Sequence, residues 1–415
     1  MNSKTIKNLL LVVLAVFISV TVIFSIGEIA GGRKIEIRAE DILIAFLGIF
    51  FIAGFFISKI KRIKRPPLLV PILVWLSFGL FSTLSNWVFS DLSLSRGFFY
   101  SLKEMEFFFI YFFVFYSLKD LKSVKFILKA WIFLGAINVS WVIIQMLKGF
   151  KGTYGQEAIG EPYAPFPSGG FFLLLFIFFF NLFLYYFSKL KMSIFKKGAL
   201  MLVCLGPALG VFSSGSRTSG LSLIIAIFLT MLLYFFKERN KATSFAFIAL
   251  ILILLVSVFL YFSPKDYAFG RSITLKGFSW EADYNNTYSR VGIWRGQILK
   301  ALEKPEHIFF GYGKSALLLY EESHSQYVRN FVETGIFGSL AFFLLIFAII
   351  KKALSVFLSE TDIFTVAMAS GLLIATVIML VISIAAEAFM VVKIAETYWF
   401  FVGLTMAGIA LKKND

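Results

Sequence analysis

The chain contains two histidines, His307 and His324, and the second lies where a proton acceptor could act. His324 belongs to SHSQYVRNFVETGIFGSLAFF, in which a polar stretch gives way to an apolar run. Imidazole is the side chain that can accept a proton from a reacting hydroxyl group near neutral pH. We therefore regard His324 as a candidate general base, and we interpret His307 as a loop histidine that bonds to backbone.

Two arginines stand out because of their surroundings. Arg217 lies in VFSSGSRTSGLSL between two apolar runs, where a charged side chain is costly unless an anionic or polar group is nearby. A guanidinium group matches two phosphate oxygens, and Ser216 and its neighbours add hydroxyl groups and accessible backbone. Arg290 heads an amphipathic stretch in the long polar segment 263–331, which also contains Arg271 and Arg295. These arginines predict an anionic ligand; alternatively, Arg217 reaches lipid headgroups or an external carboxylate.

The same segments lack the spacing of a metal site. No HxxxH or HExxH pattern accompanies the two histidines, and the single cysteine, Cys204, lies inside an apolar run. Glu321 and Glu322 precede His324, but two carboxylates coordinate a metal only weakly by themselves. We expect neither a metal ion nor an organic cofactor.

The elements that position these residues are predicted to be membrane helices. Of 415 residues, 59% are hydrophobic, 15% are charged and 53 are Phe, whereas a soluble domain averages about 45–50% apolar and about 25% charged. This composition excludes an ordinary soluble fold and predicts an all-α polytopic membrane protein. We identify twelve apolar runs that could cross a hydrocarbon core of about 30 Å, namely 8–27, 42–58, 68–89, 98–116, 127–147, 169–187, 198–213, 220–236, 245–262, 332–350, 363–384 and 395–411.

The distribution of positive charge predicts the orientation of these runs. Of 40 Lys and Arg residues, 22 lie in the termini and alternate loops, and 8 lie in the opposing short loops. Because cytoplasmic loops carry the excess of Lys and Arg, we expect both termini in the cytoplasm and the long segment 263–331 outside. The net charge of +16 therefore marks loops and does not indicate a nucleic-acid partner.

These runs predict three parts: helices one to nine in 1–262, an external loop in 263–331 and helices ten to twelve in 332–415. Within the loop, SRVGIWRGQILKALEK places apolar side chains on one helical stripe, with Ser289 as the N-cap and Pro305 as the stop. We interpret this segment as a short amphipathic helix on the outer membrane surface, and its simplest role is to anchor the loop. The stripe consists of Val291, Trp294, Ile298, Leu299 and Leu302.

Several charged residues within or beside the apolar runs remain open to more than one interpretation. Lys103, Glu104 and Glu106 in the fourth run either pair with one another, line a cavity or form the solvated end of a short run. Glu387 and Glu396, around the last two runs, are equally ambiguous.

Three segments together resemble the O-antigen ligase and polymerase superfamily. They are SSGSRTSGL at 213–221, SRVGIW at 289–294 with FFGYGKS at 309–315, and SHSQYVRNFVETGIFGSLAFF at 323–343. The last is the most specific, because it combines a histidine, a Tyr-type anchor and a Glu-x-Gly-x-x-Gly pattern leading into a helix. In this chain those positions are His324, Tyr327, Glu333, Gly335 and Gly338, and Ser325 stands where the family commonly has Asn.

The resemblance implies an O-antigen ligase, a GT-C-type glycosyltransferase of the bacterial inner membrane with a periplasmic active site. The implied donor is a glycan on undecaprenyl diphosphate, and the implied acceptor is a sugar hydroxyl of lipid A core, joined by an inverting reaction that is independent of metal. By this resemblance His324 is the base and Arg217 and Arg290 bind the diphosphate. Ser216, Tyr327 and Glu333 are supporting residues.

Two other functions remain open. A repeat-unit polymerase would use the same donor and similar arginines. A lipid-linked glycan flippase would place its charges within the helices along a central path, whereas this chain concentrates them at the outer mouth of the helix bundle. A protein O-oligosaccharyltransferase would be expected to carry a longer carboxy-terminal region.

Overall fold

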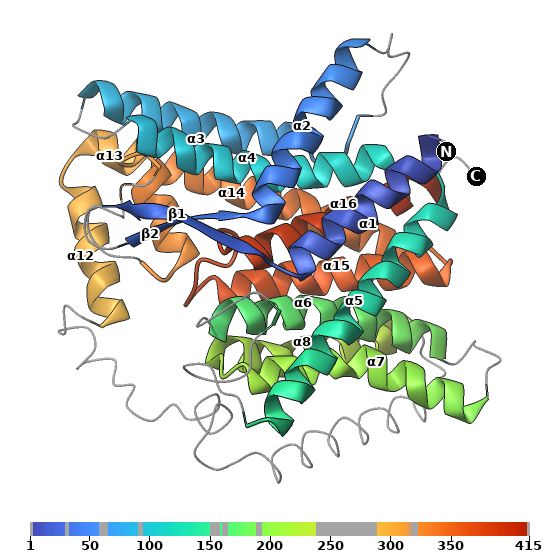
Figure 1. The fold of residues 1–415 in the computed structure, drawn as a ribbon. Helices are drawn as coiled ribbons and strands as arrows, with labels where there is room; N and C mark the ends of the chain where they lie inside the picture. Colours follow the sequence, from blue (N-terminus) through green and yellow to red (C-terminus); the bar gives the residue numbers. More distant parts are fainter. Residues whose placement is uncertain are drawn as a thin grey trace.

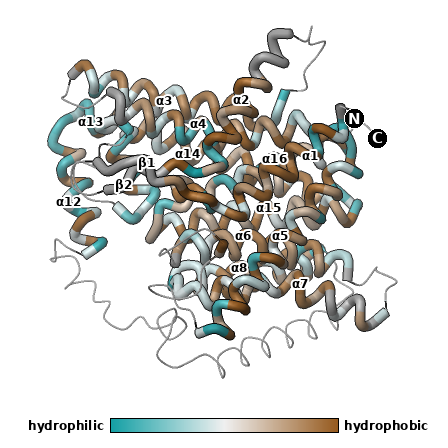
Figure 2. Tube along the Cα trace, in the orientation of Figure 1, coloured by the Kyte–Doolittle hydropathy of each residue, from teal (hydrophilic) through white to brown (hydrophobic). Residues whose placement is uncertain are grey.

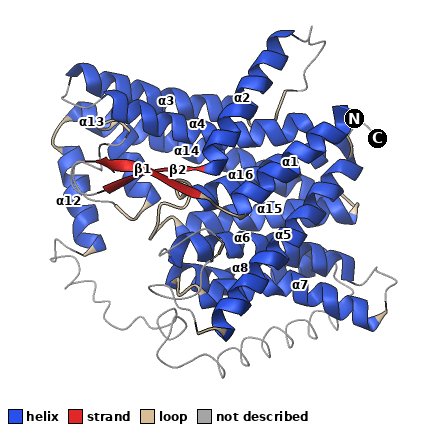
Figure 3. Ribbon diagram, in the orientation of Figure 1, coloured by secondary structure: helices blue, strands red, loops and turns tan. Residues whose placement is uncertain are grey.

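The computed structural model of the protein describes residues 3–29, 33–57, 65–89, 94–149, 158–159, 165–187, 193–237, 289–314, 316 and 323–412. These residues form a bundle of long helices with one two-stranded sheet (Figures 1 and 3). Along the chain the helices are α1 (Ser3–Ser19), α2 (Ala39–Ile57), α3 (Leu69–Phe89), α4 (Leu94–Ser117), α5 (Leu121–Leu147), α6 (Pro165–Phe187), α7 (Ile194–Ser213), α8 (Arg217–Lys237), α12 (Arg290–Leu302), α13 (Pro305–Phe310), α14 (Gln326–Ser359), α15 (Ile363–Ile382) and α16 (Val392–Lys412).

Seven of the described helices are long and apolar enough to cross a membrane: α3, α5, α6, α8, α14, α15 and α16. The predicted helical class is thus confirmed, and the seven candidate spans agree with a polytopic membrane protein, whereas the number twelve stays a prediction. The expected helix α4 is present but carries Lys103, Glu104 and Glu106 in its centre. The expected ninth run, 245–262, lies outside the described residues.

The core of the bundle consists of α6, α15 and α16. Each of these helices carries apolar residues on all sides, and such a helix is stable only when it is enclosed. Almost every residue of α6 from Phe171 to Tyr185 is buried. The outer helices instead leave large apolar side chains exposed, including Phe133, Phe228 and Phe347, as expected for a surface that faces lipid. Figure 2 shows this predominance of apolar residues along the bundle.

The sheet corrects the prediction for the first apolar run. The helix expected over 8–27 ends at Ser19, and β1 (Ile23–Ile29) pairs antiparallel with β2 (Arg33–Arg38). The segment KIEIR in β2 alternates charged and β-branched residues, and this period of two favours a strand over a helix. The two strands lie across the bundle close to α2, which follows β2 directly (Figure 3).

The two chain ends lie at one end of the bundle, and α12 and α13 lie at the other (Figure 1). The helix expected from residue 332 begins earlier, at Gln326, and a kink at Gly335 divides it. The candidate residues Arg217, Arg290 and His324 therefore lie at the starts of α8, α12 and α14.

Candidate active site

At the Glu-x-Gly-x-x-Gly segment of α14, the helix backbone crosses close to the backbone of the turn after α13. Gly335 and Gly311 both adopt positive φ, at 65° and 71°. A Cβ atom on Gly335 would lie 2.3 Å from the carbonyl carbon of Phe309, and one on Gly311 would lie 2.4 Å from that of Glu333. Only glycine permits both the conformation and the approach. The signature glycine at 335 therefore has a structural cause, which is to seat the turn after α13 against α14.

Hydrogen bonds to backbone carbonyl groups close this crossing. Two come from the turn and two from side chains of α3, so the crossing also fixes α3 against α14. They are Tyr312 N to Val332 O at 2.8 Å, Gly313 N to Glu333 O at 2.9 Å, Ser82 Oγ to Glu333 O at 2.7 Å and Asn86 Nδ2 to Gly311 O at 2.8 Å.

The crossing also places a lysine inside the bundle. Lys314 is buried, and its Nζ lies 2.6 Å from Glu104 Oε1 in α4 and 3.9 Å from Glu333 Oε2 in α14. The ammonium group also lies 4.4 Å from the ring centre of Trp75 in α3. A buried charge requires such partners, because unpaired burial is strongly unfavourable. The Lys of FFGYGKS thus joins three helices.

The ion pairs continue from Glu333 toward His324. Arg329 Nη2 lies 3.2 Å from Glu333 Oε1, and Arg329 Nη1 pairs with Glu387 Oε2. The other oxygen of Glu387 accepts a hydrogen bond of 2.9 Å from Ser323 Oγ. We call Lys314, Glu104, Glu333, Arg329 and Glu387 the buried network. It reaches from the middle of α4 to the residue before His324.

His324 is held by its neighbours while it remains exposed itself. It adopts φ 50°, between the buried residues Ser323 and Ser325. Ser323 Oγ donates to Ser325 O at 2.9 Å, and the indole Nε1 of Trp294 in α12 donates to Ser323 O at 2.5 Å. Positive φ is unusual for a residue other than glycine and is typical of a constrained position. The backbone on both sides of this imidazole is therefore fixed.

The turn between α15 and α16, residues 383–391, supports both α14 and α12. Gln326 N donates to Ser383 O at 3.0 Å and to Ala386 O at 3.2 Å, next to His324. Arg290 Nη1 donates to Ala385 O at 2.9 Å. One turn thus contacts the start of α14, which follows His324, and the first residue of α12. The turn brings together two of the three residues that the sequence predicted to act in one site.

The third residue, Arg217, is the first residue of α8 and approaches Arg290. Both arginines are exposed. Partial burial, and then the like charge of Arg217, lower the pKa of Arg290. Each arginine heads a helix, and helix amino-terminal ends favour anions. Neither forms an ion pair with a carboxylate in the described part of the chain. Two guanidinium groups whose charges interact, and that have no carboxylate partner among the described residues, form a site suited to a doubly charged ligand.

The turn before Arg217 has its own requirements. Gly215 adopts φ 75°, and a Cβ on Gly169 of α6 would lie 2.7 Å from Ser214 Oγ. Ser216 Oγ lies 2.8 Å from Ser219 Oγ and accepts a hydrogen bond from Ser219 N at 3.3 Å. Ser216 therefore caps α8 and fixes the position from which Arg217 extends.

The other two supporting residues hold α14 in the bundle. Tyr327 donates its hydroxyl to Leu380 O at 2.7 Å and stacks on Phe343. Glu333 is part of the buried network. Both are thus positioned to stabilise the helix that follows His324.

The N-cap predicted for α12 is present, but the contacts of this helix differ from the prediction. Ser289 Oγ accepts a hydrogen bond from Gly292 N at 3.1 Å, and the helix ends at Leu302, before Pro305. Leu299 and Leu302 of the predicted stripe are exposed, at 53% and 47%. The other side of the helix, with Trp294, Ile298 and Ala301, packs on Val328, Phe331 and Val332 of α14. Contact with α14 therefore fixes the helix that carries Arg290.

Histidine 307 lies apart from this site and is buried. Its ring centre is 3.7 Å from that of Tyr312, and burial lowers its pKa. The interpretation as a loop histidine that bonds to backbone needs correction, because His307 lies within α13 and its Nδ1 has no hydrogen-bond partner among the described residues. Its packing against Tyr312 gives it a structural role.

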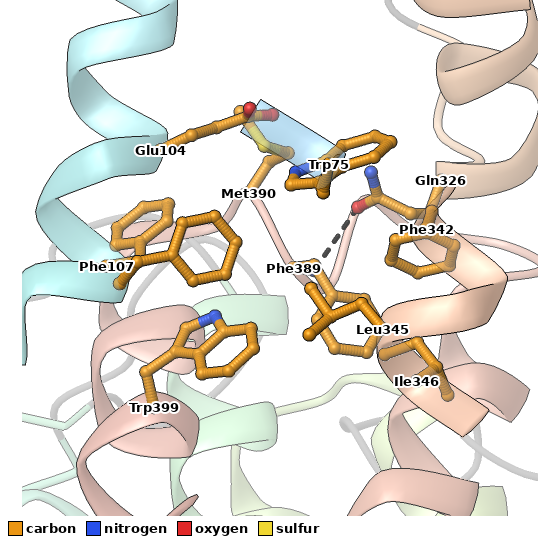
Figure 4. Close-up of a pocket in the computed structure, with 11 residues that line it drawn as sticks. Trp75, Glu104, Phe107, Gln326, Phe342, Leu345, Ile346, Phe389, Met390 and Trp399 are labelled. Atoms are coloured by element: carbon orange, nitrogen blue, oxygen red, sulfur yellow. Dashed lines mark hydrogen bonds between the residues drawn. The ribbon is translucent and has the colours of Figure 1, made fainter. Parts of the chain in front are cut away.

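A cavity of about 20 Å³ lies beside the start of α14 (Figure 4). Glu104 and Gln326 are its polar members, and Gln326 Oε1 accepts a hydrogen bond from Phe389 N at 3.3 Å. A space of this size holds about one water molecule. The apolar lining consists of Trp75, Phe107, Phe108, Phe342, Leu345, Ile346, Phe389, Met390 and Trp399.

The family model described as O-antigen ligase matches residues 200–343. The match runs from α7 into α14 and includes Arg217, Arg290 and His324. It confirms the resemblance inferred from the three segments, and members of the matched family are glycosyltransferase-like enzymes. No curated protein matches the chain.

Several residues that hold the candidate site lie outside the O-antigen ligase match. Glu387 and Ala385 lie in the turn between α15 and α16, and Glu104 lies in α4. Sequence patterns left Glu104 and Glu387 ambiguous and gave no signal for Trp294 beyond its apolar stripe. The only sign in the sequence of such a residue was a charge within or beside an apolar run. The sequence did not indicate which residue pairs with it.

Proposed function

We propose that the protein is an O-antigen ligase that transfers a glycan from undecaprenyl diphosphate to a sugar hydroxyl of lipid A core in lipopolysaccharide biosynthesis. The observation that carries this proposal is the turn 383–391, which binds both Arg290 and the residue that starts α14 after His324. The charge of Arg217 acts on Arg290 across the same site. The diphosphate is the anion that two such guanidinium groups match.

In this reaction each residue has a distinct task. His324 accepts the proton of the acceptor hydroxyl as its oxygen bonds to the anomeric carbon of the donor sugar. The bond from that carbon to the diphosphate breaks on the opposite face, which inverts the configuration. Arg217 and Arg290 stabilise the negative charge that develops on the leaving diphosphate, so no metal ion is required.

The lipid tail of the donor would lie along α8. Leu221, Ile224 and Phe228 of this helix are exposed, at 57%, 50% and 65%, and they follow Arg217 at helical spacing. A polyprenyl chain on this stripe would leave its diphosphate beside the first residue of α8. A membrane helix is suited to this task because the substrate is itself held in the bilayer.

The proposal includes a GT-C-type arrangement of about twelve membrane helices, with both termini in the cytoplasm and the site in the periplasm of the inner membrane. The positive charge of alternate loops supports it. Reporter enzymes fused at Asp415 and within 263–288 test the orientation. We expect periplasmic activity only from the internal fusion, and a periplasm-active reporter at Asp415 would refute the proposed side of the site.

Deleting the gene in its host tests the reaction itself. A ligase defect should leave lipid A core without attached glycan while long lipid-linked polymer accumulates. Attachment of single repeat units alone would instead identify a polymerase and overturn the ligase assignment. Complementation with the wild-type gene should restore the normal glycan pattern.

A further inference from the structure

A second group of charged side chains lies between α2, α4 and α16, apart from the candidate active site. One carboxylate oxygen each from Asp41, Glu106 and Glu396 lies within 4.8 Å of the other two. Each residue comes from a different helix, and none belongs to the buried network. Among the described residues this is the one group of three acidic or metal-ligating side chains that approach so closely.

Lys103 neutralises part of this group. Its Nζ lies 2.5 Å from Asp41 Oδ1 and 2.8 Å from Glu106 Oε2. One ammonium group therefore bridges two of the three carboxylates and occupies the position between them.

Glu396 has no such partner. It is fully buried, and neither of its carboxylate oxygens has a hydrogen-bond donor among the described residues. One oxygen of Glu106 is likewise unpaired within the described part of the chain. An ionised carboxylate that is buried without a donor is strongly unfavourable, so Glu396 requires a bound cation or a proton.

The charges of the surrounding groups favour the proton. The described groups whose charges interact with Glu396 come from three elements. They are Lys103 and Glu106 from α4, Glu40 and Asp41 from α2, and Arg38 from β2. Lys393 of α16 acts on Glu40. These groups and Glu396 comprise four carboxyls and three cations, so one proton makes the set neutral. A metal ion would instead have to bind beside the ammonium group of Lys103, which repels it.

We propose that Asp41, Glu106 and Glu396 form a proton-binding site inside the membrane region, in which Glu396 is a neutral carboxylic acid. With Glu396 neutral, the three cations of this set balance the three carboxylates that remain ionised. The proposal does not depend on the reaction at His324. It assigns the charges of α4 that sequence patterns left open.

Infrared spectroscopy of the purified full-length protein in lipid nanodiscs tests the proposal. We expect a carbonyl stretching band of a protonated carboxylic acid at neutral pH, and its loss in Glu396→Gln. Because glutamine has the shape of the neutral acid, this variant should keep the thermal midpoint of the wild type. An identical band in the two proteins, or its absence from the wild type, would overturn the proposal.

Dicyclohexylcarbodiimide locates the proton, because this apolar reagent adds to protonated carboxyls in membranes. Mass spectrometry should find the adduct on Glu396. Glu104 of α4 is the control. It is also buried, but it is paired with Lys314, so it should stay unmodified. Protection of Glu396 by Na⁺, Ca²⁺ or Mg²⁺ at constant pH would show that the group binds a cation and not a proton.

Discussion

The cations of the buried network and those of the candidate active site are used in opposite ways. Lys314 and Arg329 are enclosed, and each contacts two carboxylates. Arg217 and Arg290 are exposed, and neither pairs with a carboxylate in the described part of the chain. The first pair of cations holds helices together. The second pair remains available for an anion, although both pairs come from the segment that matches the O-antigen ligase family.

The two regions are nevertheless joined. Glu387 ends the buried network and binds Ser323, the residue before His324. The same turn accepts a hydrogen bond from Arg290. The network therefore provides the rigid support that a preorganised site requires, because reacting groups must be held in position before the transition state forms. Changes in the network should alter stability, and changes at the exposed residues should alter the reaction.

The largest effect is expected from His324→Ala. Removing a general base lowers the transfer rate by about a hundredfold to ten-thousandfold, while an exposed side chain contributes little to folding. Transfer from a lipid-linked donor by the purified variant measures this loss, and its amount in the membrane should equal that of the wild type. EDTA should leave wild-type transfer unchanged. Transfer within a few-fold of the wild-type rate would remove His324 from the mechanism.

The next effect belongs to the buried network. Lys314→Met leaves Glu104 without its cation, and breaking a buried ion pair on one side costs about 3–5 kcal/mol of folding free energy. We expect a lower thermal midpoint in detergent and less protein in the membrane. Adding Glu104→Gln should recover part of the loss, because the second variant removes the unpaired charge. Equal midpoints for Lys314→Met and the wild type would contradict the role assigned to the network.

Sequence patterns could suggest the exposed candidate site because its signals are local. Ser289 precedes Arg290 as a cap, Gly215 and Ser216 precede Arg217, and His324 stands at the start of a helix. The buried network gave no comparable signal, since Lys314 and Glu104 are separated by 210 residues. The hairpin of β1 and β2 was missed for a different reason. The apolar run of α1 continues directly into the start of β1. The alternation of charged and β-branched residues that indicates a strand lies only in β2.

A smaller effect is expected from Arg217→Lys and Arg290→Lys. Lysine keeps the positive charge but loses the planar contact with two phosphate oxygens, so transfer should fall by about tenfold, which corresponds to about 1.4 kcal/mol. Thermal midpoints should not change. Arg295→Lys, on an exposed position of the same helix as Arg290, is the matched control and should transfer at the wild-type rate. Wild-type rates in both test variants would favour contact of these arginines with lipid headgroups.

The smallest effect tests whether the position of Arg290, and not only its charge, matters. Ser289→Ala removes the hydroxyl that accepts a hydrogen bond from Gly292 N, and loss of such a cap costs about 1 kcal/mol of helix stability. Helix α12 also packs on α14 through Trp294 and Ile298, so the helix should remain formed with a less ordered first turn. Arg290 would then contact the diphosphate less often, and transfer should fall by about two- to fivefold. Ser289→Asp restores a cap and should recover the rate. If Ser289→Ala transfers as the wild type does, packing of α12 alone positions Arg290, and the cap contributes only to local stability.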